Sequence, residues 1–212
     1  SQGITCVMVS SGAVGAGVSA LKLDGYPDDT ASRQACAAVG QTRLMHAYEN
    51  IFQKFSLNVA QILLSAQDLN SERRSSLVMD TLHRLLKEGN IVPIINENDS
   101  VAVKELRMGD NDVLSAKVAG LLSAKMLIMF STVDGLQRPD GSVVSRVDDV
   151  DSIVGLVRAD HGKFSIGGMA SKLEAVRTAI DAGVETVIAG GRKPEALSVI
   201  VSGGEGGTRF TL

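Results

Sequence analysis

Short aliphatic runs alternate with stretches of helical periodicity along the chain. The candidate strands are residues 4–9, 59–64, 91–95, 126–130 and 186–189. Runs of this length that are rich in Val, Ile and Leu are typical of strands buried on both faces of a parallel sheet. Pro93 lies inside the third run and cannot donate a hydrogen bond to a neighbouring strand, which weakens the strand prediction at that point.

Hydrophobic residues with a period of 3.6 occupy the intervals between these runs. The shared faces consist of Leu44, Tyr48, Ile51 and Phe55 in one helix, and of Val78, Leu82 and Leu85 in the next. The second of these helices is expected to end at Gly89. Two more helices are predicted over residues 111–122 and 169–182. Strands separated by helices predict an α/β fold in which helices cover both faces of a mainly parallel sheet.

The segment 134–163 has a different pattern. Pro139-Asp140-Gly141 is a strong turn signal, and a short strand-like run, 142–144, and an acidic stretch, 148–151, follow it. We interpret the segment as a hairpin and surface excursion of one domain that spans residues 1–212.

The composition is that of a soluble domain and disfavours nucleic-acid-binding and membrane proteins. Hydrophobic residues make up 44% of the 212 residues and charged residues 21%, which is ordinary for a soluble domain. A net charge of −3 and only 3% aromatic residues disfavour a nucleic-acid binder. No run reaches the roughly 18 apolar residues that span a bilayer, and no signal peptide is visible, so we expect no membrane partner and a cytoplasmic location. Cys6 and Cys36 are expected to be reduced thiols in the core.

Polar residues follow the first and third predicted strands, where ligands bind in open α/β sheets. Ser10, Ser11 and several glycines follow the first strand. They fit either an anion site at a helix N-terminus or a simple tight turn, and both interpretations stay open. Five polar residues, 96–100, follow the third strand. A helix cap accounts for one of them, so a ligand site is the better explanation.

Three later segments also carry candidate chemistry. Gly109-Asp110-Asn111-Asp112 leads into the helix predicted over 111–122. Asp110 or Asn111 could cap this helix, and the remaining carboxylates could hold Mg²⁺ or orient a lysine. Ser131-Thr132 ends the fourth strand and could contact a nucleotide. Gly167-Gly168 is expected to be a loop that leads into a helix with Lys172 in its first turn, which suits a phosphate, although the spacing is not that of a P-loop. The three histidines are scattered, so no metal ligands are predicted.

Taken in order, these segments resemble the amino acid kinase family, and within it the kinases that act on glutamate. The matching stretches are residues 9–13, 37–41, 92–99, 109–112, 167–172 and 207–210. The resemblance implies a three-layer α/β/α sandwich that uses ATP with Mg²⁺ to phosphorylate the side-chain carboxylate of glutamate, the first step of proline biosynthesis. It also implies a homo-oligomer and proline as a feedback inhibitor.

The resemblance further implies roles for individual residues. Glutamate would be bound by Ser11, Gly12, Ala13, Asp99 and Asn111. Asp112 would organise the catalytic lysines, and Lys172 would neutralise the transferring phosphoryl group. The residues along ATP would be Ser131, Thr132, Ile166, Gly167, Gly168, Met169 and Lys172. Two of these depart from the family pattern, because Ile166 stands in place of a threonine and Thr132 in place of an acidic residue.

The family pattern begins with a strand that carries a lysine and a phosphate loop, and the sequence contains neither. We therefore expect an N-terminally incomplete domain with little activity on its own, and without the RNA-binding-like C-terminal domain of many bacterial members. Two alternatives stay open. One is a kinase for another acidic substrate, such as acetylglutamate, aspartate or carbamate. The other is a non-catalytic module that binds an amino acid.

Overall fold

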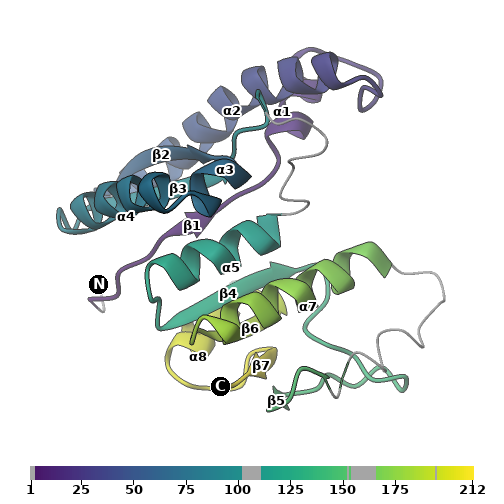
Figure 1. Cartoon of the computed structure of the whole chain (residues 1–212). Helices are drawn as coiled ribbons and strands as arrows, with labels where there is room; N and C mark the ends of the chain where they lie inside the picture. The colour runs from purple at the N-terminus through teal and green to yellow at the C-terminus, as the bar shows by residue number, and fades with distance from the viewer. Residues whose placement is uncertain (1–2, 102–110, 152, 154–165, 194) are drawn as a thin grey trace. The chain divides into compact units, whose positions relative to one another are not determined.

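The computed structural model describes residues 3–101, 111–151, 153, 166–193 and 195–212. By its contacts the chain divides into two compact units, Ser1–Asn111 and Asp112–Leu212. Each unit contains a sheet with helices, and the two are described in turn (Figure 1).

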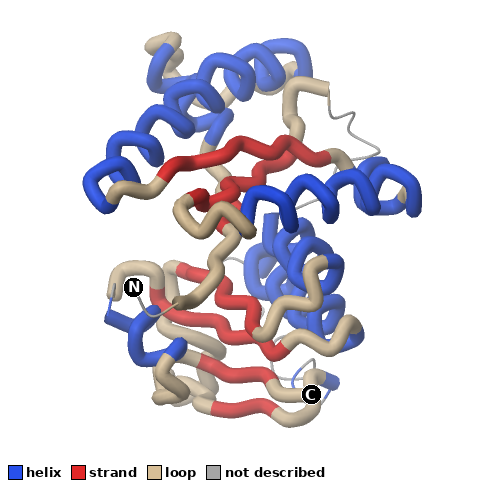
Figure 2. Tube along the Cα trace, turned by 90° about the vertical axis from the view of Figure 1, so that its left-hand side faces the viewer, coloured by secondary structure: helices blue, strands red, loops and turns tan. Residues whose placement is uncertain are grey.

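The first unit is built on a parallel sheet with the strand order β1-β3-β2. The strands are β1 (Met8–Val9), β2 (Asn58–Leu64) and β3 (Ile91–Glu97). The helices are α1 (Ala13–Ala20), α2 (Thr30–Phe52), the 3₁₀ turn η1 (Gln53–Phe55), α3 (Ala66–Asn70) and α4 (Glu72–Leu86). Figure 2 shows α1 and α2 over one face of this sheet.

Strand β1 is much shorter than the predicted run 4–9. It pairs with β3 only through Met8↔Ile94 and Val9↔Ile95, and Ile4 is exposed. The short pairing is consistent with Pro93. Ile95 accepts a hydrogen bond from Ser10 N–H on the β1 side, and alternate residues of a parallel strand bond to the same neighbour. The nitrogen of Pro93 therefore faces β1, but the hydrogen-bonded pairing of β1 with β3 does not extend as far as Pro93. Because no N–H is needed there, a proline is tolerated in this central strand.

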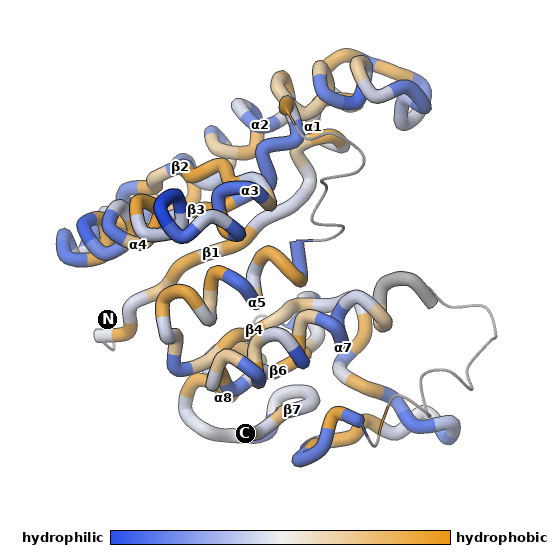
Figure 3. The backbone as a smooth tube through the Cα atoms, viewed as in Figure 1, coloured by the Kyte–Doolittle hydropathy of each residue, from blue (hydrophilic) through white to orange (hydrophobic). Residues whose placement is uncertain are grey.

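The predicted face of the first helix is only half correct. Leu44 and Tyr48 of α2 are partly buried, but Ile51 is 52% exposed and Phe55 is 70% exposed. The α-helix ends at Phe52, and the 3₁₀ turn that follows has three residues per turn, so the period of 3.6 no longer applies there. The second helix follows its prediction. Leu82 of α4 is completely buried, and Figure 3 shows hydrophobic positions interrupting an otherwise hydrophilic helix.

The second unit is built on a sheet with the order β4-β6-β7-β5. The strands are β4 (Met126–Ser131), β5 (Arg146–Val147), β6 (Glu185–Gly190) and β7 (Thr208–Phe210), and the helices are α5 (Asn111–Leu121), α7 (Ile166–Asp181) and α8 (Glu195–Val201). All pairings are parallel except the one between β6 and β7. The expected α/β architecture with mainly parallel strands is confirmed, and the described strands form two sheets.

Alternate residues of β6 serve two hydrophobic clusters. Ile188 belongs to the larger cluster, to which α5 and α7 contribute residues such as Ala116 and Val176. Val187 and Ala189 pack instead with Ile200 of α8. Because successive side chains of a strand point to opposite faces, this unit has helices on both sides of its sheet.

The hairpin predicted within 134–163 is present in its first part. Gln137 and Val143 form an antiparallel bridge, and Gly141 takes a positive φ of 83° in the turn between them. Residue 152 and residues 154–165 lie outside the described part of the chain. Elsewhere, Cys36 is buried as expected, but the prediction of a core thiol is wrong for Cys6, which is exposed on the segment before the short β1. Among the described residues, no helix is long and apolar enough to cross a membrane.

Backbone contact between α1 and α2 shapes the first unit. A Cβ atom added at Gly40 would lie 1.8 Å from the carbonyl oxygen of Ala13, and one added at Gly17 would lie 1.9 Å from that of Cys36. Both glycines are therefore required by close approach of the two helices. This contact places Gln41, the next residue of α2, beside the start of α1.

We expect Gly40→Ala to destabilise the protein by about 2 kcal/mol or more, because the helices must separate to admit a methyl group. Urea denaturation measures the change. Gly25→Ala is the matched control, since a Cβ atom there meets nothing within 4 Å, and it should change the free energy of unfolding by less than about 0.5 kcal/mol. Equal effects of the two substitutions would contradict this explanation.

Candidate active site

The polar segments predicted after the first and third strands lie together in the first unit. Because β1 runs parallel to β3, their carboxyl ends meet at one edge of the sheet. Ser10 N–H donates to the carbonyl of Ile95 at 2.8 Å, and the Ser10 hydroxyl lies 2.8 Å from the hydroxyl of Tyr48 on α2. The chain therefore enters α1 from a firmly held position.

Helix α1 begins directly after this strand end. Gly12 is its N-cap residue with a φ of 101°, a left-handed conformation that favours glycine, and no side chain caps the helix. Ser11 and Gly12 are exposed, whereas Ala13 is buried. The turn is thus tight, and it also leaves the first backbone N–H groups of α1 without a side-chain cap. Both interpretations of this glycine-rich segment remain compatible with the geometry.

A chain of amide side chains runs beneath this edge. Gln41 donates to Gln61 at 3.3 Å, and Asn96 donates to Gln41 Oε1 at 2.9 Å. Asn111 donates to Asn96 Oδ1 at 3.1 Å and to the Ser10 carbonyl at 2.9 Å. Asn96 is only 1% exposed. Because a buried amide without partners is costly, these bonds fix the relative positions of α2, β3 and Asn111.

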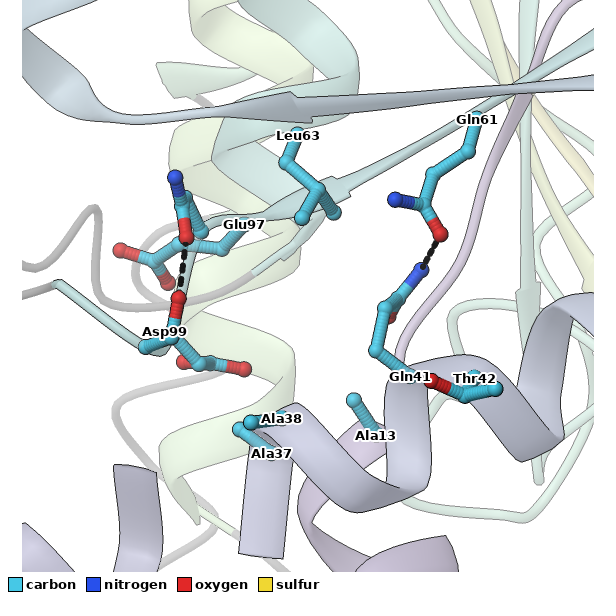
Figure 4. Close-up of a pocket in the computed structure, with 11 residues that line it drawn as sticks. Ala13, Ala37, Ala38, Gln41, Thr42, Gln61, Leu63, Glu97 and Asp99 are labelled. Atoms are coloured by element: carbon cyan, nitrogen blue, oxygen red, sulfur yellow. Dashed lines mark hydrogen bonds between the residues drawn. The ribbon is translucent and has the colours of Figure 1, made fainter. Parts of the chain in front are cut away.

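A cavity of about 170 Å³ adjoins the chain of amides, whose Gln41 and Gln61 form part of its wall. Its described lining consists of Ala13, Ala37, Ala38, Gln41, Thr42, Gln61, Leu63, Glu97, Asn98, Asp99 and Ser100. Figure 4 shows Glu97 and Asp99 at one end of the cavity and the hydrogen-bonded Gln41 and Gln61 at the other. The volume is below the roughly 300–1,000 Å³ of pockets for drug-sized ligands, so it suits a small polar molecule.

In the second unit, Lys172 of α7 forms an ion pair with Asp112 of α5. Lys172 Nζ lies 2.6 Å from Asp112 Oδ2, and each side chain is 15% exposed. Asp112 lies in the first turn of α5, where the helix dipole favours a carboxylate. Within the described residues, no group of three or more His, Cys, Asp or Glu side chains could hold a metal ion.

The remaining predicted nucleotide residues lie on two elements of this unit. Ser131 ends β4, and its carbonyl accepts a hydrogen bond from Gly191 N–H at 2.8 Å, whereas Thr132 follows it in an exposed position. Met169 packs against the larger hydrophobic cluster. The prediction of a glycine loop is wrong, because Ile166, Gly167 and Gly168 form the first turn of α7 and Lys172 falls in its second turn.

A second cavity, of about 440 Å³, lies at the carboxyl ends of β4 and β6. Its described lining includes Gly190, Gly206 and an ion pair of 2.7 Å between Lys193 and Asp134. A hydrogen bond and Coulombic attraction from Asp134 raise the pKa of Lys193. Neither Ser131 nor Thr132 belongs to this described lining.

Sequence reasoning missed several residues that the structure connects to the site. Gln61 and Tyr48 reach it through side-chain hydrogen bonds to Gln41 and Ser10, and Lys193 reaches its cavity from the loop after β6. Only Gln41 had a signal, because it ends the matched stretch 37–41. Asp110 lies outside the described residues.

The fold is of the α/β class, and its polar side chains gather where such folds bind small molecules. The chain belongs to the amino acid kinase family, whose sequence model matches residues 1–190.

Three relatives with similar sequences share one activity within this family. The chain is 43% identical to the glutamate 5-kinase of Clostridium acetobutylicum over 99% of its own length and 80% of the relative. It is 41% identical to the glutamate 5-kinase of Symbiobacterium thermophilum, covering 99% of this chain and 82% of that protein. For the glutamate 5-kinase of Synechococcus elongatus the identity is 43%, and 59% of that protein is covered.

Solved structures with low sequence identity support the fold alone. The chain matches carbamate kinase from Giardia lamblia bound to AMP-PNP with a TM-score of 0.62 and 18% identity, covering 99% of this chain and 84% of that one. The match to the isopentenyl phosphate kinase of T. acidophilum has a TM-score of 0.61 and 14% identity, with 98% and 83% covered.

The Asp112–Lys172 pair is less exposed than the Asp134–Lys193 pair, so we expect the two pairs to differ in how strongly their charges stabilise each other. A double-mutant cycle with Asp112→Asn and Lys172→Met should give a coupling energy of about 1–3 kcal/mol, because the pair is largely removed from water. The same cycle with Asp134→Asn and Lys193→Met serves as the control. That pair is 52% and 57% exposed, so we expect less than about 1 kcal/mol. Equal coupling energies in urea denaturation would disprove the structural role of the Asp112–Lys172 pair.

Proposed function

We propose that the chain is the kinase domain of an ATP-dependent glutamate 5-kinase, which forms glutamyl 5-phosphate in the first step of proline biosynthesis. The observation that carries the proposal is the 43% identity to a glutamate 5-kinase over 99% of the chain. The small polar cavity at the carboxyl edge of the first sheet and the Asp112–Lys172 pair support it.

Glutamate is assigned to the cavity of the first unit. Ala13, Ala37 and Ala38 give it a narrow apolar wall, and Asp99 lies at its end. A carboxylate such as that of Asp99 suits the α-ammonium group of an amino acid. The exposed Ser11 and Gly12 at the start of α1 provide backbone donors for a substrate carboxylate, since a helix N-terminus favours an anion. Asn111 is held by the same chain of amides.

The reaction needs positive charge rather than a general base. The side-chain carboxylate of glutamate has an ordinary pKa of about 4.3 and is already ionised at neutral pH. One of its oxygens forms a bond to the γ-phosphorus of ATP, the bond from that phosphorus to the β–γ bridging oxygen breaks, and ADP leaves with the electron pair. Lys172 neutralises the oxygens of the transferring group, and Asp112 holds the Lys172 ammonium in place.

Mg²⁺ fits this arrangement if it enters the site bound to the phosphates of ATP. Mg²⁺ is usually held by one or two carboxylates and by substrate phosphates rather than by a cage of protein ligands. The described residues contain no such cage. Asp112 is the carboxylate that would lie nearest to a nucleotide-bound Mg²⁺ in this proposal. When bound, Mg²⁺ would reduce the negative charge on the phosphates. The ATP contacts expected of Ser131, Thr132, Met169 and the start of α7 are part of the proposal, as are homo-oligomer formation, feedback inhibition by proline and a cytoplasmic location.

The substrate is tested with a panel of acceptors. The purified full-length protein is incubated with ATP, Mg²⁺ and either glutamate, aspartate, acetylglutamate or carbamate, and ADP release is measured. Glutamate should be preferred by at least about a hundredfold in kcat/KM, and its product should be trapped as a hydroxamate. Preference for another acceptor, or no turnover at all, would refute the proposal and favour the alternative kinases or a binding module.

The catalytic pair is tested by substitution. Asp112→Ala and Lys172→Met should each lower kcat by about 10²–10³-fold, because the transferring phosphoryl group loses its fixed positive charge. Lys125→Met is the control, since Lys125 is exposed at the amino end of β4, and it should keep full activity. Circular dichroism checks that all three variants are folded. Normal turnover by a folded Asp112→Ala protein would disprove the assigned role.

A further inference from the structure

The orientation of the Asn96 amide is determined by its neighbours. Asn96 Oδ1 lies 2.8 Å from the backbone nitrogen of Glu97. A backbone N–H can only donate, so the atom that it meets must be the amide oxygen. Asn96 Nδ2 must then point the other way, where it donates to Gln41 Oε1 at 2.9 Å. Both ends of this completely buried side chain are therefore assigned.

This orientation determines the role of Asn111. Its Nδ2 donates to Asn96 Oδ1 and also to the backbone carbonyl of Ser10, which can only accept. An amide nitrogen carries two hydrogens, and these two bonds use both. In any hydrogen bond between the Asn111 side chain and a ligand, Oδ1 must therefore be the acceptor. Such a group binds an ammonium or an N–H, and it does not bind a carboxylate.

Gln41 is the residue that holds the other end of Asn96. It is 8% exposed, and it comes from α2 at the point where Gly40 packs against the backbone of α1. Its Oε1 accepts from Asn96, and its Nε2 donates to Gln61, whose side chain reaches the exposed edge of the cavity. Without this acceptor, the buried NH₂ group of Asn96 would have no partner in Gln41, and the Asn96 amide would be held only through its Oδ1 by the N–H of Glu97 and the NH₂ group of Asn111.

We propose that Gln41 is a positioning residue for substrate selection. Through Asn96 it holds the Asn111 amide with its NH₂ group engaged, which leaves Oδ1 as the side-chain atom that can contact a substrate and makes the site select for the α-ammonium group of an amino acid. Gln41 itself belongs to the cavity lining, but both ends of its amide are engaged by Asn96 and Gln61, so it acts through these neighbours and takes no part in phosphoryl transfer. The inference rests on the proposed function, because the ammonium group belongs to the glutamate substrate.

The test compares glutamate with glutarate, which has both carboxylates but no ammonium group. Gln41→Met keeps the length of the side chain and removes the acceptor. The KM for glutamate should rise about tenfold, as expected for one lost buried hydrogen bond, whereas the inhibition constant of glutarate and the KM for ATP should change less than about threefold. Gln53→Met, at an exposed position just after α2, is the control and should leave all three values unchanged.

The conservative variant Gln41→Glu keeps an acceptor for Asn96. Its added charge acts on the carboxylates of both ligands, so the ratio of glutamate KM to glutarate inhibition constant should stay within about threefold of the wild type. Equal weakening of glutamate and glutarate by Gln41→Met would show a merely structural role and overturn the inference, as would an unchanged glutamate KM. A wild-type protein that does not phosphorylate glutamate would instead overturn the proposed function.

Discussion

The common direction of neighbouring strands is the constraint on which the candidate site depends. In the first unit, β1 and β2 both run parallel to β3, and in the second β4 runs parallel to β6. Segments that are distant in sequence therefore end at the same edge of a sheet. Ser10 and Asn96 are brought within reach of Asn111 in this way, and Ser131 is brought beside Gly191. An antiparallel arrangement of the same strands would place these groups at opposite edges.

This constraint explains why much of the architecture could be predicted from the sequence. Buried aliphatic runs and periodic helices are local patterns, and they identified β2, β3, β4, β6, α4 and α5 within a few residues. The polar residues behind them could be expected to form sites because parallel strands end together. Family resemblance then supplied the expected roles of Asp99 and Asn111 in binding glutamate and made those of Asp112 and Lys172 specific, and these roles stay predictions.

Other features depend on contacts that leave no local pattern. The length of β1 is set by where β3 offers a partner, and β7 has three residues, too few for a visible period. The amide chain joins Gln41 to Asn96 across 55 positions of sequence, and each member alone looks like an ordinary polar residue. The exposure of Ile51 and Phe55 likewise follows from a change of helix type, which hydrophobic periodicity does not report.

The contact between α1 and α2 has a consequence for how the sequence can vary. A side chain at Gly17 or Gly40 would meet a carbonyl oxygen of the other helix and not a side chain. A mismatch between two side chains can be repaired by making the partner smaller, but a carbonyl oxygen has no smaller substitute. Each glycine is therefore constrained separately, and the two positions should not compensate for each other in related sequences.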